Sequence, residues 1–330
     1  MQLVINTYGT YLHIKDELFE VRIKKDGIVQ KHHFASQKVK SILLSKGAAI
    51  STDAIILAVK NNIDILVFEY DGTPIGRFWH SRPGSTSKIR KKQLEASLNE
   101  IGVKWVKDWL AAKIDNQAEF LLRLKKNRAN KSLMLDEKIE SIENLKKKII
   151  SLHALEISEI DDTLRGLEGT AGRIYFQTLN ELLSERYKFS GRSFRPAKDP
   201  FNAFLNYAYG ILYSRVEKTL TIAGLDPFVG FMHRDDYNTK SLVFDFIEPY
   251  RIIADEVVFK LFSAKKVNDK HSDKITNGYS LNAEGKNLLV QHFFKFFDED
   301  KIRHKNRNQT RSNAMQLDAH HFANQLIKKQ

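Results

Sequence analysis

The pattern of apolar and polar positions changes character after residue 80. Before that point, short runs rich in β-branched and aromatic residues alternate partly with polar residues. The runs VINTYGTYLHI, FEVRIKK and IVQKHHF predict strands, with a hairpin turn at the Asp-Gly pair 26–27. The run IDILVFEYDGTPIGRFW predicts further strands around a second Asp-Gly turn at 71–72. Between these groups, STDAIILAVKNN predicts one helix, capped by Ser51 or Thr52.

From Ile89 onward the apolar positions follow a helical period almost everywhere. The predicted helices cover residues 89–99, 102–126, 134–153, 158–186, 200–223, 249–263, 284–297 and 312–328. The helix at 200–223 has the clearest ends, because Asp199 can cap it and Gly224 follows it. The polar and basic segment 264–280 predicts a loop.

These patterns predict an α+β protein with a small N-terminal β-rich domain at 1–80 and a larger all-α domain at 89–330. The segment SRPGSTSK at 81–88 has no apolar anchor, which favours a linker. No apolar run approaches the roughly 18–20 residues that cross a bilayer. The N-terminus MQLVINTYGTYLHI has neither the basic region nor the cleavage site of a signal peptide. We therefore expect a cytoplasmic protein without a membrane partner.

Composition narrows the chemistry and suggests a partner. The chain has no cysteine, which excludes disulfides, cysteine-based zinc sites and cysteine nucleophiles. The formal net charge of +13 favours a polyanionic partner, nucleic acid before an anionic membrane. Three basic clusters in the helical part could form a phosphate track, although each alone also fits a solvated helix face. The clusters are Lys88, Arg90, Lys91, Lys92; Arg123, Lys125, Lys126, Arg128, Lys131; and Arg303, Lys305, Arg307, Arg311.

The stretch LRGLEGTAGRIYF places an acid among helix-breaking residues. Gly166, Gly169 and Gly172 recur at every third position of a predicted helix, and Glu168 lies between them. Each glycine destabilises a helix by roughly 1 kcal/mol relative to alanine. Three glycines in one helix therefore need a reason other than helix stability. Glycines at this spacing clear one flank of the helix for another helix, a backbone or a ligand. The spacing does not match a nucleotide-binding loop.

A second stretch, GFMHRDDYNTKSLVFDFIEPYR, surrounds one imidazole and two carboxylates with apolar residues. His233 can be a core histidine, and Asp245 and Glu248 can cap the following helix. Alternatively, His233, Asp245 and Glu248 converge with Glu168 on a cation. Oxygen ligands with one nitrogen suit Mg²⁺ or Mn²⁺. A hard cation next to a basic surface fits phosphodiester chemistry.

Several motifs resemble one known family. The stretches KGAAISTDAIILAVKNNIDILVFEYDGTPIGRF, LEGTAGRIYF, DPFNAFLNYAYGILY, GLDPFVGFMH and VFDFIEPYR occur in order and span nearly the whole chain. In combination they resemble the CRISPR-associated endonuclease/integrase of the spacer-acquisition, or adaptation, module. The resemblance implies a β-domain that pairs two subunits and a helical catalytic domain.

The resemblance also implies a site and a reaction. Glu168, His233 and Glu248 would bind Mg²⁺ or Mn²⁺, with Asp245 adjacent and able to share the role. The family captures double-stranded DNA fragments and inserts them at the repeats of a CRISPR array by transesterification. Its partners are a second copy of the chain and a small companion protein of the adaptation module. Asn202, Tyr175 and Arg251 become candidates for supporting or phosphate-contacting roles. A non-catalytic DNA-binding scaffold and a standalone metal-dependent nuclease remain the alternatives.

Overall fold

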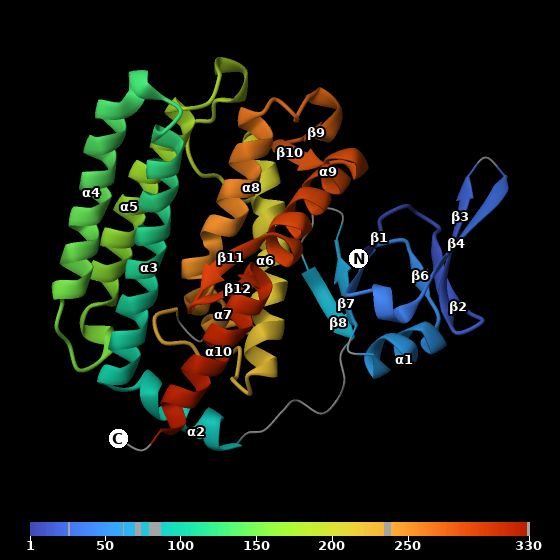
Figure 1. Ribbon diagram of the computed structural model, residues 1–330, viewed down its shortest axis with the longest axis horizontal. Coiled ribbons are helices and arrows are strands. Elements are labelled where there is room, and N and C mark those ends of the chain that lie inside the picture. Colours follow the sequence, from blue (N-terminus) through green and yellow to red (C-terminus); the bar gives the residue numbers. More distant parts are fainter. Residues whose placement is uncertain (26, 62, 70–73, 79–86, 234–238, 329–330) are drawn as a thin grey trace.

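The computed structural model describes residues 1–25, 27–61, 63–69, 74–78, 87–233 and 239–328. A β-rich N-terminal region lies beside a larger, mostly helical C-terminal region (Figure 1). This arrangement confirms the predicted fold class. Among the described helices, none is long and apolar enough to cross a bilayer.

The N-terminal region contains two four-stranded sheets and one helix. One sheet has the order β1-β5-β7-β8, and the other has the order β4-β3-β2-β6. The strands are β1 (Gln2–Ile5), β2 (Tyr11–Lys15), β3 (Leu18–Lys25), β4 (Ile28–Phe34), β5 (Ser41–Ser45), β6 (Ala49–Ile50), β7 (Asp64–Phe68) and β8 (Pro74–Phe78). Helix α1 (Thr52–Lys60) joins the two sheets, and the Ser51 hydroxyl caps it by accepting a hydrogen bond from the Ala54 amide at 3.2 Å.

Both predicted hairpins form. Strand β3 pairs with β4, and β7 pairs with β8, in each case antiparallel. Gly27 has a φ of +79°, which favours glycine in the first turn. Asp26 and the second Asp-Gly pair, 71–72, lie outside the described residues.

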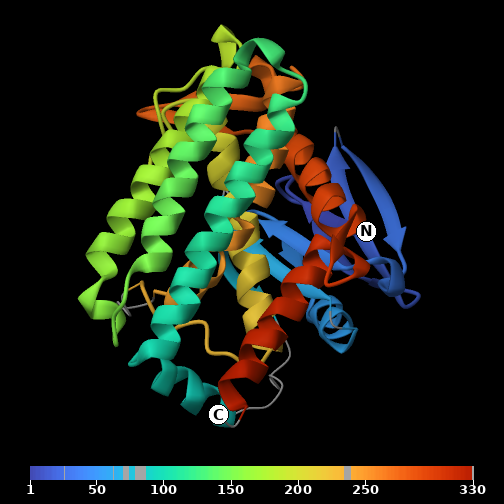
Figure 2. The same cartoon turned by 60° about the vertical axis from the view of Figure 1, so that its left-hand side comes forward.

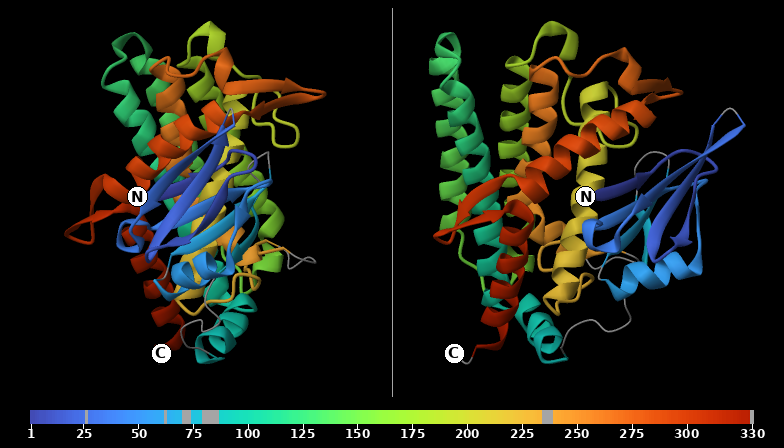
Figure 3. Two further views of the ribbon diagram at one scale, coloured as in Figure 1. Left: turned by 90° about the vertical axis from the view of Figure 1, so that its right-hand side faces the viewer. Right: turned by 45° about the vertical axis from the view of Figure 1, so that its right-hand side comes forward.

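The C-terminal region is largely helical. Its long helices are seen from another side in Figure 2, and the right-hand view of Figure 3 shows them beside the N-terminal strands. Its helices are α2 (Ser87–Ser97), α3 (Glu100–Lys125), α4 (Ser132–Ser151), α5 (Asp161–Glu181), α6 (Pro200–Ile222), α7 (Ser241–Phe246), α8 (Arg251–Ser263), α9 (Ala283–Phe294) and α10 (Arg311–Ile327). As predicted, the Asp199 carboxylate caps α6 by accepting from the Asn202 amide at 2.8 Å.

Two predictions for this region were wrong. The region is not all-α, because it carries two small hairpins: β9 (Ser272–Ile275) with β10 (Gly278–Leu281), and β11 (Lys301–His304) with β12 (Arg307–Thr310). The first hairpin begins at Ser272, so it takes up the second half of the segment 264–280, which the sequence predicted as a loop. Tyr279 of β10 also forms a bridge with Ala197, which attaches the hairpin to the segment before α6.

The two regions meet through shared core residues. Leu43, Leu66 and Phe68 of the first sheet belong to the same buried cluster as the helices. Residues 81–86 of the expected linker lie outside the described part, and Ser87 and Lys88 already belong to α2. The division into separate domains at 1–80 and 89–330 stays a prediction.

Candidate active site

One cavity of about 410 Å³ lies among the helices of the C-terminal region. Glu168, His233 and Glu248 all line it, although they come from α5, from the segment before α7 and from the short turn η5 (Glu248–Tyr250). The described lining residues are Lys113, Gln117, Arg165, Glu168, Gly172, Phe176, Arg192, Tyr209, Met232, His233, Glu248, Arg251 and Asp255. Three of the four predicted site residues therefore meet at one place.

Glu168 projects from a helix whose neighbouring flank is bare. A Cβ atom added at Gly166 or Gly169 would meet no atom within 4 Å, and both residues are exposed. At Gly172 the nearest atom would be Glu168 Oε1 at 4.0 Å. No neighbouring helix therefore packs against these glycines, which excludes close helix packing as the reason for their spacing. They leave open space beside Glu168 that a large ligand can approach.

Glu248 is buried and faces two cations. Its Oε1 accepts a hydrogen bond from Arg251 Nε at 2.9 Å. Its Oε2 lies 2.6 Å from Lys113 Nζ, but it accepts no hydrogen bond with normal geometry. Burial disfavours the charged carboxylate, yet the charges of Arg251 and Lys113 outweigh burial and lower the pKa of Glu248 to about 2. Glu248 is therefore ionised at neutral pH, and its Oε2 is contacted by the Lys113 ammonium alone.

Lys113 of α3 lies between the two glutamates, and the sequence did not identify it. Its ammonium contacts Glu168 Oε1 as well as Glu248 Oε2. Burial would lower the pKa of Lys113, but the charges of Glu248 and Glu168 hold this pKa above its ordinary value. On α3 it shares a buried face with Trp109, Leu110 and Gln117, but this helical spacing does not report its contacts with the two glutamates.

His233 is held in place by Asp245. Asp245 Oδ1 accepts from the His233 amide at 3.1 Å and contacts His233 Nδ1 at 2.6 Å. Asp245 Oδ2 accepts from the amides of Phe231 and Met232 at 2.6 and 3.1 Å. Because a carboxylate can only accept, Nδ1 carries a proton and Nε2 is the nitrogen of the neutral ring with a lone pair. Asp245 thus lies one layer behind the cavity and positions the imidazole.

This geometry also excludes the helix-cap reading of the second acidic motif. Asp245 lies inside α7, and Tyr250 is the residue before α8, where no side chain caps the helix. The tight approach of α7 to the segment before it depends on Gly230. A Cβ atom at Gly230 would lie 2.4 Å from Ser241 Cβ and 3.1 Å from Asp245 Oδ2.

Arginines form the basic side of the cavity. The Arg192 guanidinium lies 5.5 Å from the centre of the Tyr209 ring and donates to the Asn202 amide oxygen. Asn202 is fully buried, so it supports Arg192 and does not line the cavity itself. Arg251 contacts Glu248 and lies 5.1 Å from the same Tyr209 ring. Tyr175 is fully buried in α5 and acts as a core residue.

Asp255 is the third acid among the described residues that line the cavity, and the sequence did not identify it. Its Oδ1 accepts from the Tyr209 hydroxyl at 2.5 Å, and its Oδ2 has no hydrogen-bond partner. Only 1% of its surface is exposed. Burial raises the pKa of Asp255 to about 6, against the opposing effects of the Tyr209 hydrogen bond and nearby arginines.

The donor set fits a hard divalent cation. Two carboxylates already share one cationic group, and the imidazole nitrogen that faces away from Asp245 is available as a ligand. Carboxylate oxygens with one imidazole suit Mn²⁺ or Mg²⁺. In the described part of the chain, however, no three acidic or histidine side chains stand close enough to hold a metal in their present positions. The Lys113 ammonium stands in the position between the carboxylates that a metal would take.

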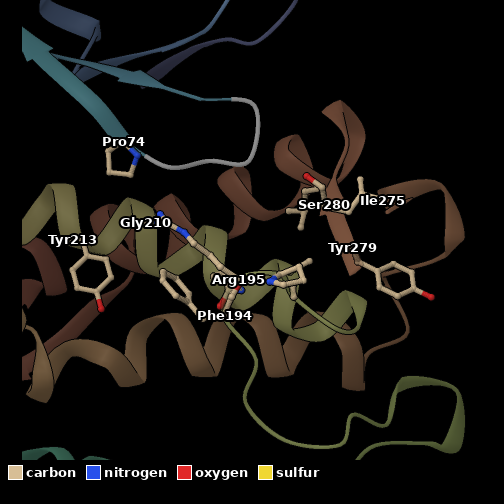
Figure 4. A pocket seen from close by; sticks show the side chains of 13 residues that line it. Pro74, Phe194, Arg195, Gly210, Tyr213, Ile275, Tyr279 and Ser280 are labelled. Carbon is tan, nitrogen blue, oxygen red and sulfur yellow. The ribbon is translucent and has the colours of Figure 1, made fainter. Parts of the chain in front are cut away.

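A second hollow, of about 320 Å³, lies between the N-terminal region and the helices (Figure 4). Pro74, Phe194, Tyr213 and Tyr279 are among its mainly apolar lining residues. Arg195 is the one charged side chain among the described residues that line it. The described residues that line this hollow include no acid and no imidazole, so it does not bring together the predicted site residues as the first cavity does.

Comparisons with known proteins point to one family. The family model described as CRISPR associated protein Cas1 matches residues 3–295. The CRISPR-associated endonuclease Cas1 1 of Archaeoglobus fulgidus is 32% identical, over 97% of this chain and 94% of the relative. The protein of the same name from Thermodesulfovibrio yellowstonii is 30% identical, over 81% of each chain.

Solved structures share the fold. A casposase bound to integration product has a TM-score of 0.83 at 22% identity and covers 98% of this chain and 90% of its own. A Cas1 protein from Thermotoga maritima has a TM-score of 0.80 at 21% identity, over 100% of this chain and 98% of its own. A chain of a Cas6-RT-Cas1–Cas2 complex has a TM-score of 0.77 at 22% identity, over 99% of this chain and 35% of its own.

Proposed function

The chain belongs to the Cas1 family of CRISPR-associated proteins, and from that premise we propose that it is a metal-dependent DNA integrase and endonuclease. The observation that carries the proposal is the meeting of Glu168, His233 and Glu248 in one cavity. The casposase structure with an integration product has the same fold, which is consistent with strand transfer here.

The residues in and behind the cavity would have different roles in the reaction. Glu168, Glu248 and Nε2 of His233 would hold Mg²⁺ or Mn²⁺, which supplies Lewis acidity at a phosphoryl oxygen. Asp245 holds the imidazole by its Nδ1 proton, which fixes the nitrogen that faces a ligand. Arg192 and Arg251 place positive charge where a phosphodiester would enter.

The proposed reaction is a transesterification. The 3′-oxygen of a captured DNA fragment loses its proton and forms a bond to a phosphorus atom at a CRISPR repeat. The bond from that phosphorus to the 3′-oxygen of the repeat strand breaks, and that oxygen takes up a proton. With water in place of the 3′-hydroxyl, the same site would cleave DNA.

The partners follow from the family and the charge. The net charge of +13 suits double-stranded DNA, both the fragment and the repeat. A Cas1–Cas2 complex is among the structures with this fold, so we propose a small Cas2-like companion. We also propose that two copies pair through the N-terminal β-rich region and that the complex works on chromosomal DNA in the cytoplasm, in defence against invading DNA.

Strand transfer into a supercoiled plasmid that carries a repeat tests the proposal. Wild type, Glu168→Gln and His233→Ala are compared in Mn²⁺, in Mg²⁺ and in EDTA, with the companion protein present. We expect metal-dependent joining by wild type, loss of at least about 100-fold in both variants, and DNA affinity unchanged within about threefold. His153→Ala, at an exposed histidine far from the cavity, is the matched control.

Other outcomes would favour the alternatives. Tight DNA binding without any metal-dependent reaction supports a non-catalytic scaffold. Cleavage of generic duplexes without joining at the repeat supports a standalone nuclease. Joining that persists in EDTA or in His233→Ala contradicts the assignment of the site.

A further inference from the structure

Lys113 lies in the place between Glu168 and Glu248 where the proposed function puts a metal. We propose that Lys113 is the resident counterion of these two carboxylates and that it makes divalent-metal binding conditional on the arrival of a DNA phosphate. This inference rests on the proposed function, because it concerns how the same site acquires its metal.

The geometry makes the ammonium and a metal direct competitors. Lys113 Nζ contacts Glu168 Oε1 and lies 2.6 Å from Glu248 Oε2. The other oxygen of Glu248 is engaged by Arg251. A cation that binds Glu248 must therefore use Oε2, the oxygen that the ammonium now contacts. Metal binding requires Lys113 to move away.

The charge balance opposes a metal in the DNA-free protein. Among the described lining residues, Lys113, Arg165, Arg192 and Arg251 are cationic, whereas Glu168, Glu248 and Asp255 are acidic. Arg165 is paired with Asp161 and Asp162 outside the cavity, so the other three cations balance the three carboxylates. The cavity therefore has no excess negative charge that would attract a metal ion. A divalent ion adds two further charges within a few ångströms, in a partly buried place where screening is weak. Phosphate groups of DNA supply the negative charge that offsets them.

Lys113 is the cation best able to leave. Its ammonium is a compact charge on a flexible four-carbon chain, so it can turn toward a phosphate without loss of its helix position. Arg251 is more firmly fixed, because it contacts Glu248 through two nitrogens and lies against the rings of Tyr209 and Tyr213. The bare flank at Gly169 leaves room for a DNA strand beside Glu168.

The consequence is reciprocal coupling between two ligands. If DNA raises the affinity for the metal by some factor, the metal raises the affinity for DNA by the same factor. Loss of the Lys113 charge should remove much of this coupling, because the carboxylates then attract a metal whether or not DNA is present.

Mn²⁺ binding to the full-length, metal-free protein tests the idea by electron paramagnetic resonance and titration calorimetry. Wild type and Lys113→Met are measured with and without a short duplex at constant ionic strength. We expect Lys113→Met to bind Mn²⁺ at least tenfold more tightly than wild type without DNA. We expect DNA to raise the Mn²⁺ affinity of wild type at least tenfold and that of the variant less than threefold. Lys104→Met removes an exposed lysine of the same helix and is the matched control.

Thermal unfolding gives a second readout that does not depend on activity. Metal-free Lys113→Met should melt at a lower temperature than wild type, because two close carboxylates lose their counterion. Mn²⁺ should raise the melting temperature of the variant more than that of wild type. If Lys113→Met does not fold, Lys113→Gln, which removes the charge but keeps a polar side chain, is measured in the same way and decides the role of Lys113.

Each contrary outcome has a distinct meaning. Equal or weaker Mn²⁺ binding in Lys113→Met, or wild-type affinity that DNA leaves unchanged, overturns the role of Lys113 while the proposed function stands. Mn²⁺ binding to Lys113→Met that survives both His233→Ala and Glu168→Gln places the metal elsewhere. That result overturns the proposed site together with this inference.

Discussion

Replacement of Asp255 by asparagine should remove a loss of folding stability that occurs as the pH rises. Burial raises the pKa of Asp255 to about 6, whereas an aspartate in an unfolded chain titrates near about 3.9. Because the folded state has the higher pKa, it holds the proton more tightly than the unfolded state. The stabilising contribution is therefore complete below about pH 4 and is lost as the pH rises through about 6.

The expected size follows from that difference. Roughly two pKa units at about 1.4 kcal/mol each make about 3 kcal/mol in full. About 2 kcal/mol of this is lost between pH 4 and pH 7, because an unfolded aspartate is already about half ionised at pH 4. Asparagine keeps an oxygen for the Tyr209 hydroxyl and cannot ionise. Its amide nitrogen would replace Asp255 Oδ2, which has no partner. That nitrogen adds a pH-independent cost of about 1–3 kcal/mol.

The test is urea unfolding followed by circular dichroism at several pH values between 4 and 7. The free energy of unfolding of Asp255→Asn, minus that of wild type, should rise by about 2 kcal/mol over this interval. Asp269→Asn, at a side chain that is 95% exposed, is the control and should show no such rise. A difference that stays constant within about 0.5 kcal/mol would refute the reasoning, because Asp255 would then ionise as easily in the fold as outside it.

Three further substitutions test the surroundings of the cavity. Asp245→Asn should lower the free energy of unfolding by about 2 kcal/mol and reduce strand transfer, because an amide group cannot accept from all four N–H donors; urea unfolding and the joining assay check this. Gly230→Ala should cost about 1–3 kcal/mol, since its Cβ would lie 2.4 Å from Ser241 Cβ; full stability would contradict the close packing. Gly169→Ala should stabilise the protein by about 0.5–1 kcal/mol yet weaken DNA binding, which thermal melting and a binding titration separate.

Much of the fold could be predicted because the residues at a helix end themselves determine where the helix begins or stops. Asp199 and Gly224 mark the ends of α6 through their own backbone preferences, whatever packs around them. The hairpins β9–β10 and β11–β12 were missed because their strands are short and polar, with no alternation to signal a buried face. Their formation depends on tertiary contacts such as the bridge between Ala197 and Tyr279.

The acids of the motifs could be proposed from sequence, but their neighbours could not. Lys113 reaches Glu168 across 55 positions of the chain, and no local pattern reports such a contact. A single charged residue inside a helical period looks the same whether it is solvated or buried. The glycines around Glu168 had two explanations in the sequence, and the empty space at Gly166 distinguishes them.

The hydrogen-bond inventory bears on which carboxylate of the second acidic motif meets a metal. Asp245 accepts from three backbone amides and one imidazole nitrogen, which together occupy about all four lone-pair positions of a carboxylate. Glu248 Oε2 accepts none and has only the Lys113 ammonium nearby. A carboxylate oxygen that binds a metal must lose hydrogen bonds that it accepts. Asp245 would therefore lose its hydrogen bonds to the segment that carries His233. Asp245 cannot hold the imidazole and at the same time turn toward a metal. We therefore propose Glu248 as the ligand and Asp245 as the residue that positions His233.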